Sequence, residues 1–170
     1  MDNNNIQQVK NLLSNSDKDT LPSVIEQIRD TGVPKLLPTL VDIYKKCDDT
    51  DVRTAIFNLL SDVSQRDIVD AMVDCIINET DINVKQMLIT SCWYSRIDYL
   101  PRLEVFIDLV LSSPFELAFE AFTVIENRPS EISDERREQL TSYINNRIDN
   151  VTKGNEELAK GLLRIIGNHN

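Results

Sequence analysis

The feature that most constrains this chain is a repeat of about 32 residues. Leu37-Pro38-Thr39-Leu40 returns as Leu100-Pro101-Arg102-Leu103, with Val69 midway between them. Asp49-Thr50-Asp51-Val52-Arg53 returns as Asp81-Ile82-Asn83-Val84-Lys85. Apolar residues recur at helical spacing throughout, and alternation with a period of two is never sustained. A period in the low thirties predicts an α-solenoid, because one helix pair cannot bury both of its apolar stripes until the next pair stacks on it.

The repeats divide the 170 residues into a row of expected helix pairs. We expect one all-α domain over 1–170, with an N-terminal capping pair in 1–32, repeats in 33–64, 66–95 and 98–128, and a degenerate C-terminal repeat in 130–167. The 41% of hydrophobic residues is sufficient for a core, whereas 4 glycines and 6 prolines are too few for the tight turns of an all-β fold.

The two motifs resemble those of HEAT repeats, in which Leu-Pro-x-Leu lies in the first helix and Asp-x-x-Val-Arg opens the second. The resemblance covers most of the chain and is strongest over two units. It implies a right-handed α-α superhelix of about four to five helix pairs, whose second helices line a concave surface. Armadillo-type and other helical arrays are the alternatives. The resemblance also implies that Arg53 and Lys85 pair with the loop aspartates Asp49 and Asp81 across neighbouring units.

Alignment of the expected second helices on one apolar residue each separates a core side from an open side. The alignment residues are Val52, Val84, Leu117 and Leu158; the core columns are Ile56, Leu88, Ala121 and Leu162, then Phe57, Ile89, Phe122 and Leu163, then Leu60, Cys92, Ile125 and Ile166. The third helix has a second register, with Ala118 in place of Leu117. That register moves Phe119 into the column of Arg53 and Lys85.

The open side is polar or small apart from Phe119 and Trp93, which is the sole tryptophan. Large aromatic residues on an exposed face are typical of binding hot spots. The predicted partner-binding residues are Asn58, Gln86, Thr90, Trp93 and Glu126. In the alternative interpretation, Trp93 packs over the next unit around Tyr99 and Leu103.

Helix-start signals agree with these boundaries. Ser113-Pro114-Phe115-Glu116 has the pattern of a capping box, and Asn155 and Asp98 are predicted N-caps. Asp48, Asp49 and Asp51 cluster at another expected helix start. We interpret this cluster as helix capping rather than a calcium loop, because the turn has no glycine and no glutamate at the twelfth position.

The charge balance bears on the class of partner. The chain has 28 acidic and 18 basic residues, a formal charge of −10 and a pI near 4.6. Such a surface disfavours binding to nucleic acid or to an anionic membrane, and no stretch is apolar for long enough to span a bilayer. The N-terminus lacks the pattern of a signal peptide, and Cys47, Cys75 and Cys92 form no Cys-x-x-Cys pair. We therefore expect reduced thiols in a cytoplasmic protein.

The sequence carries no motif for catalysis, a metal or a cofactor. His169 is the only histidine and is far in sequence from any cysteine, and the four glycines are isolated. We therefore expect a non-catalytic protein-protein interaction module that binds a protein partner on its concave face. The alternatives are an acidic inhibitor or immunity-type protein that binds a basic enzyme, and a helical-repeat enzyme such as a lyase or glycosylase.

Overall fold

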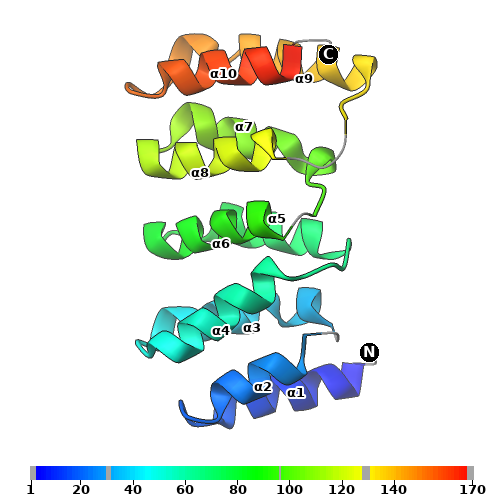
Figure 1. Cartoon of the computed structure of the whole chain (residues 1–170), viewed down its shortest axis with the longest axis vertical. Helices are drawn as coiled ribbons and strands as arrows, with labels where there is room; N and C mark the ends of the chain where they lie inside the picture. The colour runs from blue at the N-terminus through cyan, green and yellow to red at the C-terminus, as the bar shows by residue number, and fades with distance from the viewer. Residues whose placement is uncertain (1–2, 30–31, 96, 128–130, 168–170) are drawn as a thin grey trace. The chain divides into compact units, whose positions relative to one another are not determined.

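Figure 1 shows the computed structural model of the chain, which describes residues 3–29, 32–95, 97–127 and 131–167. Within these ranges it contains ten α-helices and no strand, so the predicted all-α class is confirmed. The α-helices are α1 (Asn3–Asn15), α2 (Leu21–Gln27), α3 (Val33–Lys46), α4 (Thr50–Ser61), α5 (Ile68–Asn78), α6 (Ile82–Tyr94), α7 (Leu103–Ser112), α8 (Phe115–Glu126), α9 (Asp134–Asn145) and α10 (Glu156–Gly167); the 3-10 helices are η1 (Leu100–Arg102) and η2 (Ile148–Asn150).

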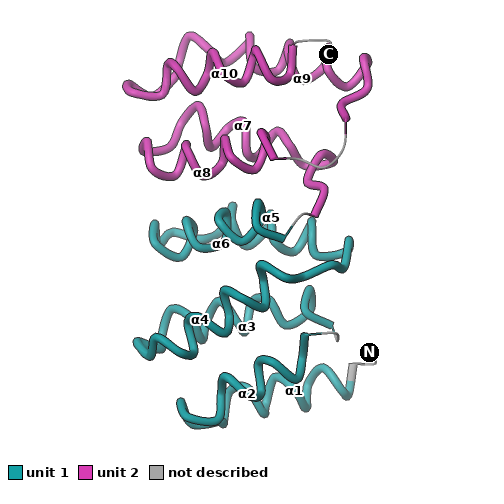
Figure 2. The backbone as a smooth tube through the Cα atoms, viewed as in Figure 1, with its two compact units in different colours: residues 1–95 teal, residues 96–170 magenta. Residues whose placement is uncertain are grey.

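The chain divides into two compact units (Figure 2). Unit 1 comprises residues 1–95 and contains α1 to α6, and unit 2 comprises residues 96–170 and contains α7 to α10. The expected capping pair and the first two expected repeats therefore lie in unit 1. The last two expected repeats lie in unit 2.

Unit 1 consists of two layers of helices. In one layer α1 packs against α3 and α3 against α5; in the other α2 packs against α4 and α4 against α6. The layers meet in an aliphatic core, in which Leu36, Leu37 and Leu40 of α3 are fully buried, as are Ile56 and Leu60 of α4. Since each such side chain contributes about 1.5–3 kcal/mol when buried, the apolar stripes of neighbouring pairs hold the unit together.

The repeated Asp-x-x-Val motif forms the same helix cap twice in unit 1. Asp49 Oδ1 accepts hydrogen bonds from the N–H groups of Asp51 (2.9 Å) and Val52 (3.2 Å) at the start of α4. Asp81 Oδ1 accepts equivalent bonds at the start of α6, at 2.9 and 3.2 Å. The motif therefore acts within its own helix. The aspartate accepts hydrogen bonds from N–H groups that have no partner within the helix, and the valine three residues later lies in the core.

The pairing predicted for Arg53 is wrong. Its Nη2 lies 3.2 Å from Asp48 Oδ1, and its guanidinium lies 5.3 Å from the centre of the Tyr44 ring. Asp49 is directed to the backbone of α4 instead, so the neighbouring aspartate takes the cation. The contact stays within one helix pair and does not fix the stacking of two.

Other ion pairs join successive helix pairs of unit 1. Arg29, which follows α2, places Nη1 2.6 Å from Asp62 Oδ2 at the end of α4. Lys45 of α3 places Nζ 2.9 Å from Glu79 Oε1, immediately after α5. The Glu79 side chain is 5% exposed and also accepts the N–H groups of Thr80 and Asp81, both at 2.8 Å. These partners are 33 and 34 residues apart, close to one repeat.

Unit 2 contains two helix pairs, in which α9 packs against α7 and α10 packs against both α7 and α8. Phe106 is fully buried and meets the ring of Tyr99 edge to face, with the centroids 5.5 Å apart. On the first helices, Arg136 of α9 bonds to Glu104 of α7 at 2.7 Å, and the Tyr143 hydroxyl donates to Asp108 at 2.7 Å. These contacts join the two pairs as the ion pairs of unit 1 do.

Three predicted helix starts in unit 2 differ in detail. The N-cap of α8 is Pro114, which makes no side-chain cap bond, so the predicted capping box at Ser113 is wrong. The Asn155 backbone carbonyl accepts the N–H of Ala159 at the start of α10. The fully buried Asn155 amide turns away and donates to the carbonyls of Val110 and Ser113, each at 2.9 Å. The asparagine is therefore a bridge from α10 to the end of α7. The N-cap of η1 is Tyr99 and that of α7 is Arg102, so the predicted N-cap at Asp98 is wrong; Asp98 lies one residue earlier than Tyr99, and its Oδ1 accepts the N–H of Leu100 at 3.0 Å.

The helix starts settle the register of the third repeat in favour of Leu117. The helices α4, α6, α8 and α10 each begin two residues before their alignment residue. The columns of Ile56 and Leu60 are buried in all four helices. The open-side columns contain no buried residue; they are Thr54, Gln86, Phe119 and Lys160, then Asn58, Thr90, Thr123 and Arg164, then Ser61, Trp93, Glu126 and Gly167. The column of Phe57 is less buried than expected, because only Ile89 is buried in it while Phe57, Phe122 and Leu163 are half-buried. Leu158 is also half-buried.

Candidate functional site

The structure places four of the five predicted partner-binding residues on two helices that pack together in unit 1. Asn58 is exposed on α4, and Gln86, Thr90 and Trp93 are half-buried on α6. Glu126 is exposed at the end of α8, in unit 2. The predicted set is therefore divided between two surfaces, which we describe separately.

The first surface is built around the end of α6. The ring of Trp93 stacks on that of Tyr94, with the centroids 3.9 Å apart and 25° between the planes. Tyr94 meets Phe57 of α4 edge to face at 5.7 Å. Tyr94 is 51% exposed, while Trp93 and Phe57 are half-buried, so Trp93 is neither a core residue nor fully open. We call Phe57, Trp93 and Tyr94 the α6 aromatic surface.

Sequence reasoning identified Trp93 but not its two partners. Phe57 was assigned to the core because its column is apolar in all four second helices. Tyr94 lies outside the aligned columns, although two consecutive aromatic residues at a helix end were a visible signal. Successive helical residues point about 100° apart, so one of such a pair is commonly directed outward.

The second surface is on α8. Phe115 and Phe119 are 52% and 53% exposed, and their rings stack with the centroids 6.2 Å apart. Phe122 is half-buried and lies over Gly161 of α10, where an added Cβ would meet its ring at 2.8 Å. The glycine thus lets α10 approach the ring closely. We call Phe115, Phe119 and Phe122 the α8 aromatic surface; their spacing of four and three residues puts them along one side of the helix.

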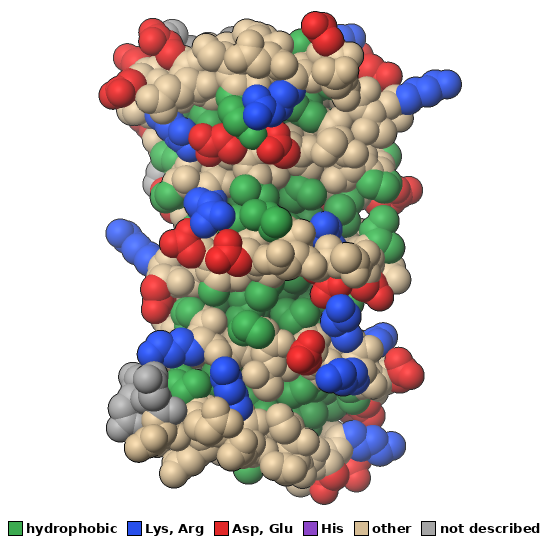
Figure 3. Space-filling view, turned by 180° about the vertical axis from the view of Figure 1, so that it is seen from behind, with side chains coloured by type: hydrophobic (Ala, Val, Ile, Leu, Met, Phe, Trp, Pro, Cys, Tyr) green, Lys and Arg blue, Asp and Glu red, His purple; other side chains and the backbone are tan. Residues whose placement is uncertain are grey.

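The helix that carries the α8 aromatic surface is acidic, whereas the adjacent helix α10 carries both signs of charge. The helix carries Glu116, Glu120 and Glu126 and no lysine or arginine. On the adjacent helix α10, Lys160 Nζ lies 2.6 Å from Glu157, and Arg164 is exposed. By contrast, acidic and basic side chains are interspersed over both units on the side seen in Figure 3.

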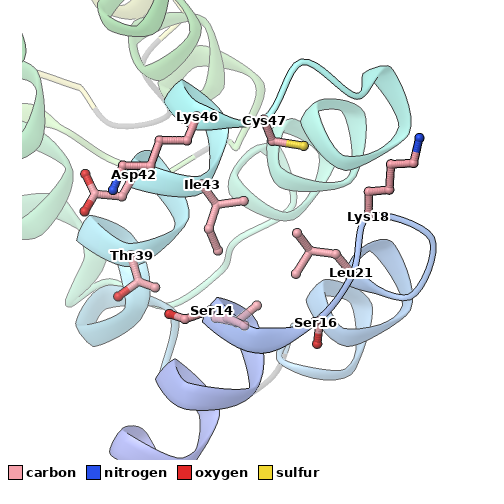
Figure 4. Close-up of a pocket in the computed structure, with 10 residues that line it drawn as sticks. Ser14, Ser16, Lys18, Leu21, Thr39, Asp42, Ile43, Lys46 and Cys47 are labelled. Carbon is pink, nitrogen blue, oxygen red and sulfur yellow. The ribbon is translucent and has the colours of Figure 1, made fainter.

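A separate pocket of about 490 Å³ lies in unit 1 (Figure 4). Leu13, Leu21 and Ile43 give it apolar walls, and Asp42 and Lys46 of α3 also line it. Lys18 points away from its centre (Figure 4). The lining thus combines apolar walls with charged side chains of both signs. It contains no histidine that could act as a base toward Cys47 or the two serines.

Two groups with a perturbed pKa, Tyr143 and Glu79, lie in contacts between helix pairs. Burial and the hydrogen bond to Asp108 raise the pKa of Tyr143 to about 12. Burial acts to raise the pKa of Glu79, but hydrogen bonds from the Asp81 N–H, Lys45 and the Thr80 N–H together lower it. Both residues link helix pairs. Among the residues that the structure describes, no three His, Cys, Asp or Glu side chains are grouped to hold a metal, and His169 lies outside them.

A comparison with protein-family models gives no match, and a comparison with curated protein sequences gives no significant similarity. None of the helices in the described part of the chain has both the length and the apolar character of a membrane span. The functional interpretation therefore depends on the geometry of the two aromatic surfaces.

Proposed function

We propose that this chain is a non-catalytic protein-interaction module that binds a protein partner through its second helices. One observation carries the proposal: the Trp93–Tyr94 stack lies at the end of a helix whose neighbouring open positions, Gln86 and Thr90, are polar. Large aromatic side chains with a polar rim are the residues that supply most of the binding energy in protein interfaces. A HEAT-like superhelix, with this surface on its concave side, is part of the proposal.

The contacts of the α6 aromatic surface suit such a role. Tyr94 is held from two sides, by Trp93 at 3.9 Å and by Phe57 at 5.7 Å, so its exposed ring is already ordered. A partner that covers it loses little additional side-chain entropy. Asn58 is exposed on the same helix as Phe57 and supplies an amide that can donate and accept hydrogen bonds at the rim.

The test is quantitative capture from native lysate with the full chain as bait, comparing the wild type with Trp93→Ala and Tyr94→Ser. A matched control is Ile77→Ser, which removes a 52% exposed apolar side chain from α5 of the same unit. We expect a partner that is retained by wild type and control and lost with both aromatic variants. Equal recovery with all four proteins would exclude the α6 aromatic surface, provided that their melting curves agree.

A second candidate is an acidic inhibitor of a basic enzyme. The observation in its favour is the acidic helix α8 in a chain of net charge −10. The two candidates differ in salt dependence, because charge-driven association weakens steeply between about 50 and 300 mM salt whereas burial of aromatic rings does not. Affinity for the captured partner across this range decides between them.

A further inference from the structure

We infer that the α8 aromatic surface binds a cationic amphipathic helix of a protein partner. This inference extends the proposed function to a second surface and to a stated partner chemistry. It begins from Phe115 and Phe119, two stacked aromatic rings that each leave about half of their surface to solvent. Exposed apolar groups of this size on consecutive turns of one helix match the ridge of apolar side chains on an amphipathic helix.

The support beneath the rings gives the surface a fixed shape. Leu117 and Ala121 of α8 are buried, which anchors the helix from its other side. Phe122 is held against Gly161 of α10, so the third ring continues the surface toward the neighbouring helix. The stacked pair therefore lies on an ordered helix, with about half of each side chain open to a ligand without a folding step.

The acidic side chains of α8 favour a positively charged partner. Glu116 and Glu126 are exposed and lie before and after Phe119 on α8, about 15 Å apart at the helical rise of 1.5 Å per residue. With no cation on α8, both ends of the apolar patch are acidic. On α10 the Lys160 charge is matched by Glu157, and Arg164 is an exposed cation in the last turn of that helix.

A partner helix with leucines along one face and lysine or arginine about ten residues apart complements this pattern. Its cations reach the two glutamates, and an arginine can also lie over a phenylalanine face. An anionic membrane is a poor occupant, because the same glutamates repel its headgroups. An acidic helix is disfavoured for the same reason.

The experiment uses the full chain and a fluorescently labelled peptide of about 15 residues, with leucine and lysine arranged for an amphipathic helix. A second peptide replaces every lysine with glutamate, and a third scrambles the leucine–lysine order. Binding is followed by fluorescence anisotropy. We expect the patterned leucine–lysine peptide to bind at least about tenfold more tightly than either of the others.

Three variants separate the contributions. Phe119→Ser should weaken binding of the patterned peptide about tenfold or more, since it removes half of the stacked pair. Glu116→Gln combined with Glu126→Gln should weaken it severalfold and flatten its salt dependence. Ile77→Ser, which removes an equally exposed apolar side chain from α5 of unit 1, is the matched control and should leave it unchanged.

Several results would overturn the inference. If the peptide is held only by general attraction to the acidic chain, Phe119→Ser will bind it as tightly as the wild type does. The scrambled peptide will then bind as tightly as the patterned one. Equal loss in the Tyr94→Ser variant of the capture experiment would assign the peptide to the α6 aromatic surface. Self-association of the chain that disappears in Phe119→Ser, measured by sedimentation, would show that a second copy covers the surface. A negative result with the peptide does not affect the capture experiment on Trp93 and Tyr94, because the two experiments concern different surfaces. A negative capture result likewise leaves the peptide experiment valid.

Discussion

Replacement of Glu79 tests the Lys45–Glu79 ion pair, which joins two helix pairs of unit 1 and has a buried carboxylate. Its Oε1 accepts the N–H groups of Thr80 and Asp81 and the Nζ of Lys45, at 2.8, 2.8 and 2.9 Å. Asp81 is in turn the side-chain cap of α6. Glu79→Ala therefore removes the acceptor shared by Lys45 and the two backbone N–H groups. It also loosens the turn that positions Asp81 at the start of α6.

The magnitude follows from the two backbone bonds. Hydrogen bonds contribute about 1 kcal/mol each, and more when the acceptor is charged. Thr80 and Asp81 are exposed, so their N–H groups regain water in the variant, and we therefore use the lower value for each. We assign nothing to Lys45, because its side chain is 37% exposed and rehydrates. The free energy of unfolding should fall by about 2–3 kcal/mol, the upper end including the weakened cap of α6.

The pH dependence has a defined sign. Burial raises the pKa of Glu79, but hydrogen bonds from Asp81, Lys45 and Thr80 outweigh it and lower the pKa below the ordinary value of 4.5. A carboxyl group with a lowered pKa in the folded state stabilises the fold above its unfolded pKa and loses this contribution as the pH falls through the folded value. The difference between wild type and Glu79→Gln should thus be constant near neutrality and shrink below about pH 4.5.

Urea denaturation followed by circular dichroism measures both effects. The control is Glu26→Ala, which removes an exposed carboxylate paired with Arg29 at 2.7 Å in the same unit and should change stability little. Our reasoning is refuted if Glu79→Ala matches the control, or if the stability difference between wild type and Glu79→Gln grows as the pH falls.

Three further predictions concern the core and unit 2. Leu60→Asp places an unpaired charge at a fully buried position and should unfold the chain at room temperature, whereas exposed Asn58→Asp should change stability by less than about 0.5 kcal/mol; equal melting curves would contradict the assignment of faces. Asn155→Ala should cost about 2–3 kcal/mol in urea denaturation, because two carbonyls at the end of α7 lose their donor, and a loss below about 0.5 kcal/mol would oppose this. Tyr143 should ionise with a pKa of about 12 in ultraviolet titration and at lower pH in Asp108→Asn; an unchanged titration would show that Asp108 is not responsible.

Much of the helical layout was predictable because it depends on local rules. The repeat places Asp49 and Asp81 at helix starts, and the capping of N–H groups by an aspartate is a property of four adjacent residues. Burial at Ile56 and Leu60 follows from the helical period of the apolar residues. These features need no knowledge of distant contacts.

The contacts between helix pairs were not predictable in the same way. Two aspartates, Asp48 and Asp49, precede α4, and Arg53 pairs with Asp48 because the Asp49 carboxylate is directed to the backbone of the helix. Asn155 reads as a helix cap, yet its amide turns to α7 because two carbonyls 42 and 45 residues earlier lie within reach. Each outcome is decided by tertiary geometry that residue spacing does not encode.

The aromatic surfaces illustrate the difference between core columns, which repeat, and open columns, which do not have to. Core columns are constrained by packing and therefore repeat, so a departure from the pattern there destabilises the fold. Open columns are free of this constraint, and an aromatic residue such as Trp93 or Phe119 in a polar column is not required by the repeat itself. Tyr94 and Phe115 were missed because the comparison covered aligned columns and stopped at the helix ends. Aromatic residues on the open side of the second helices are thus features that the repeat pattern neither requires nor predicts.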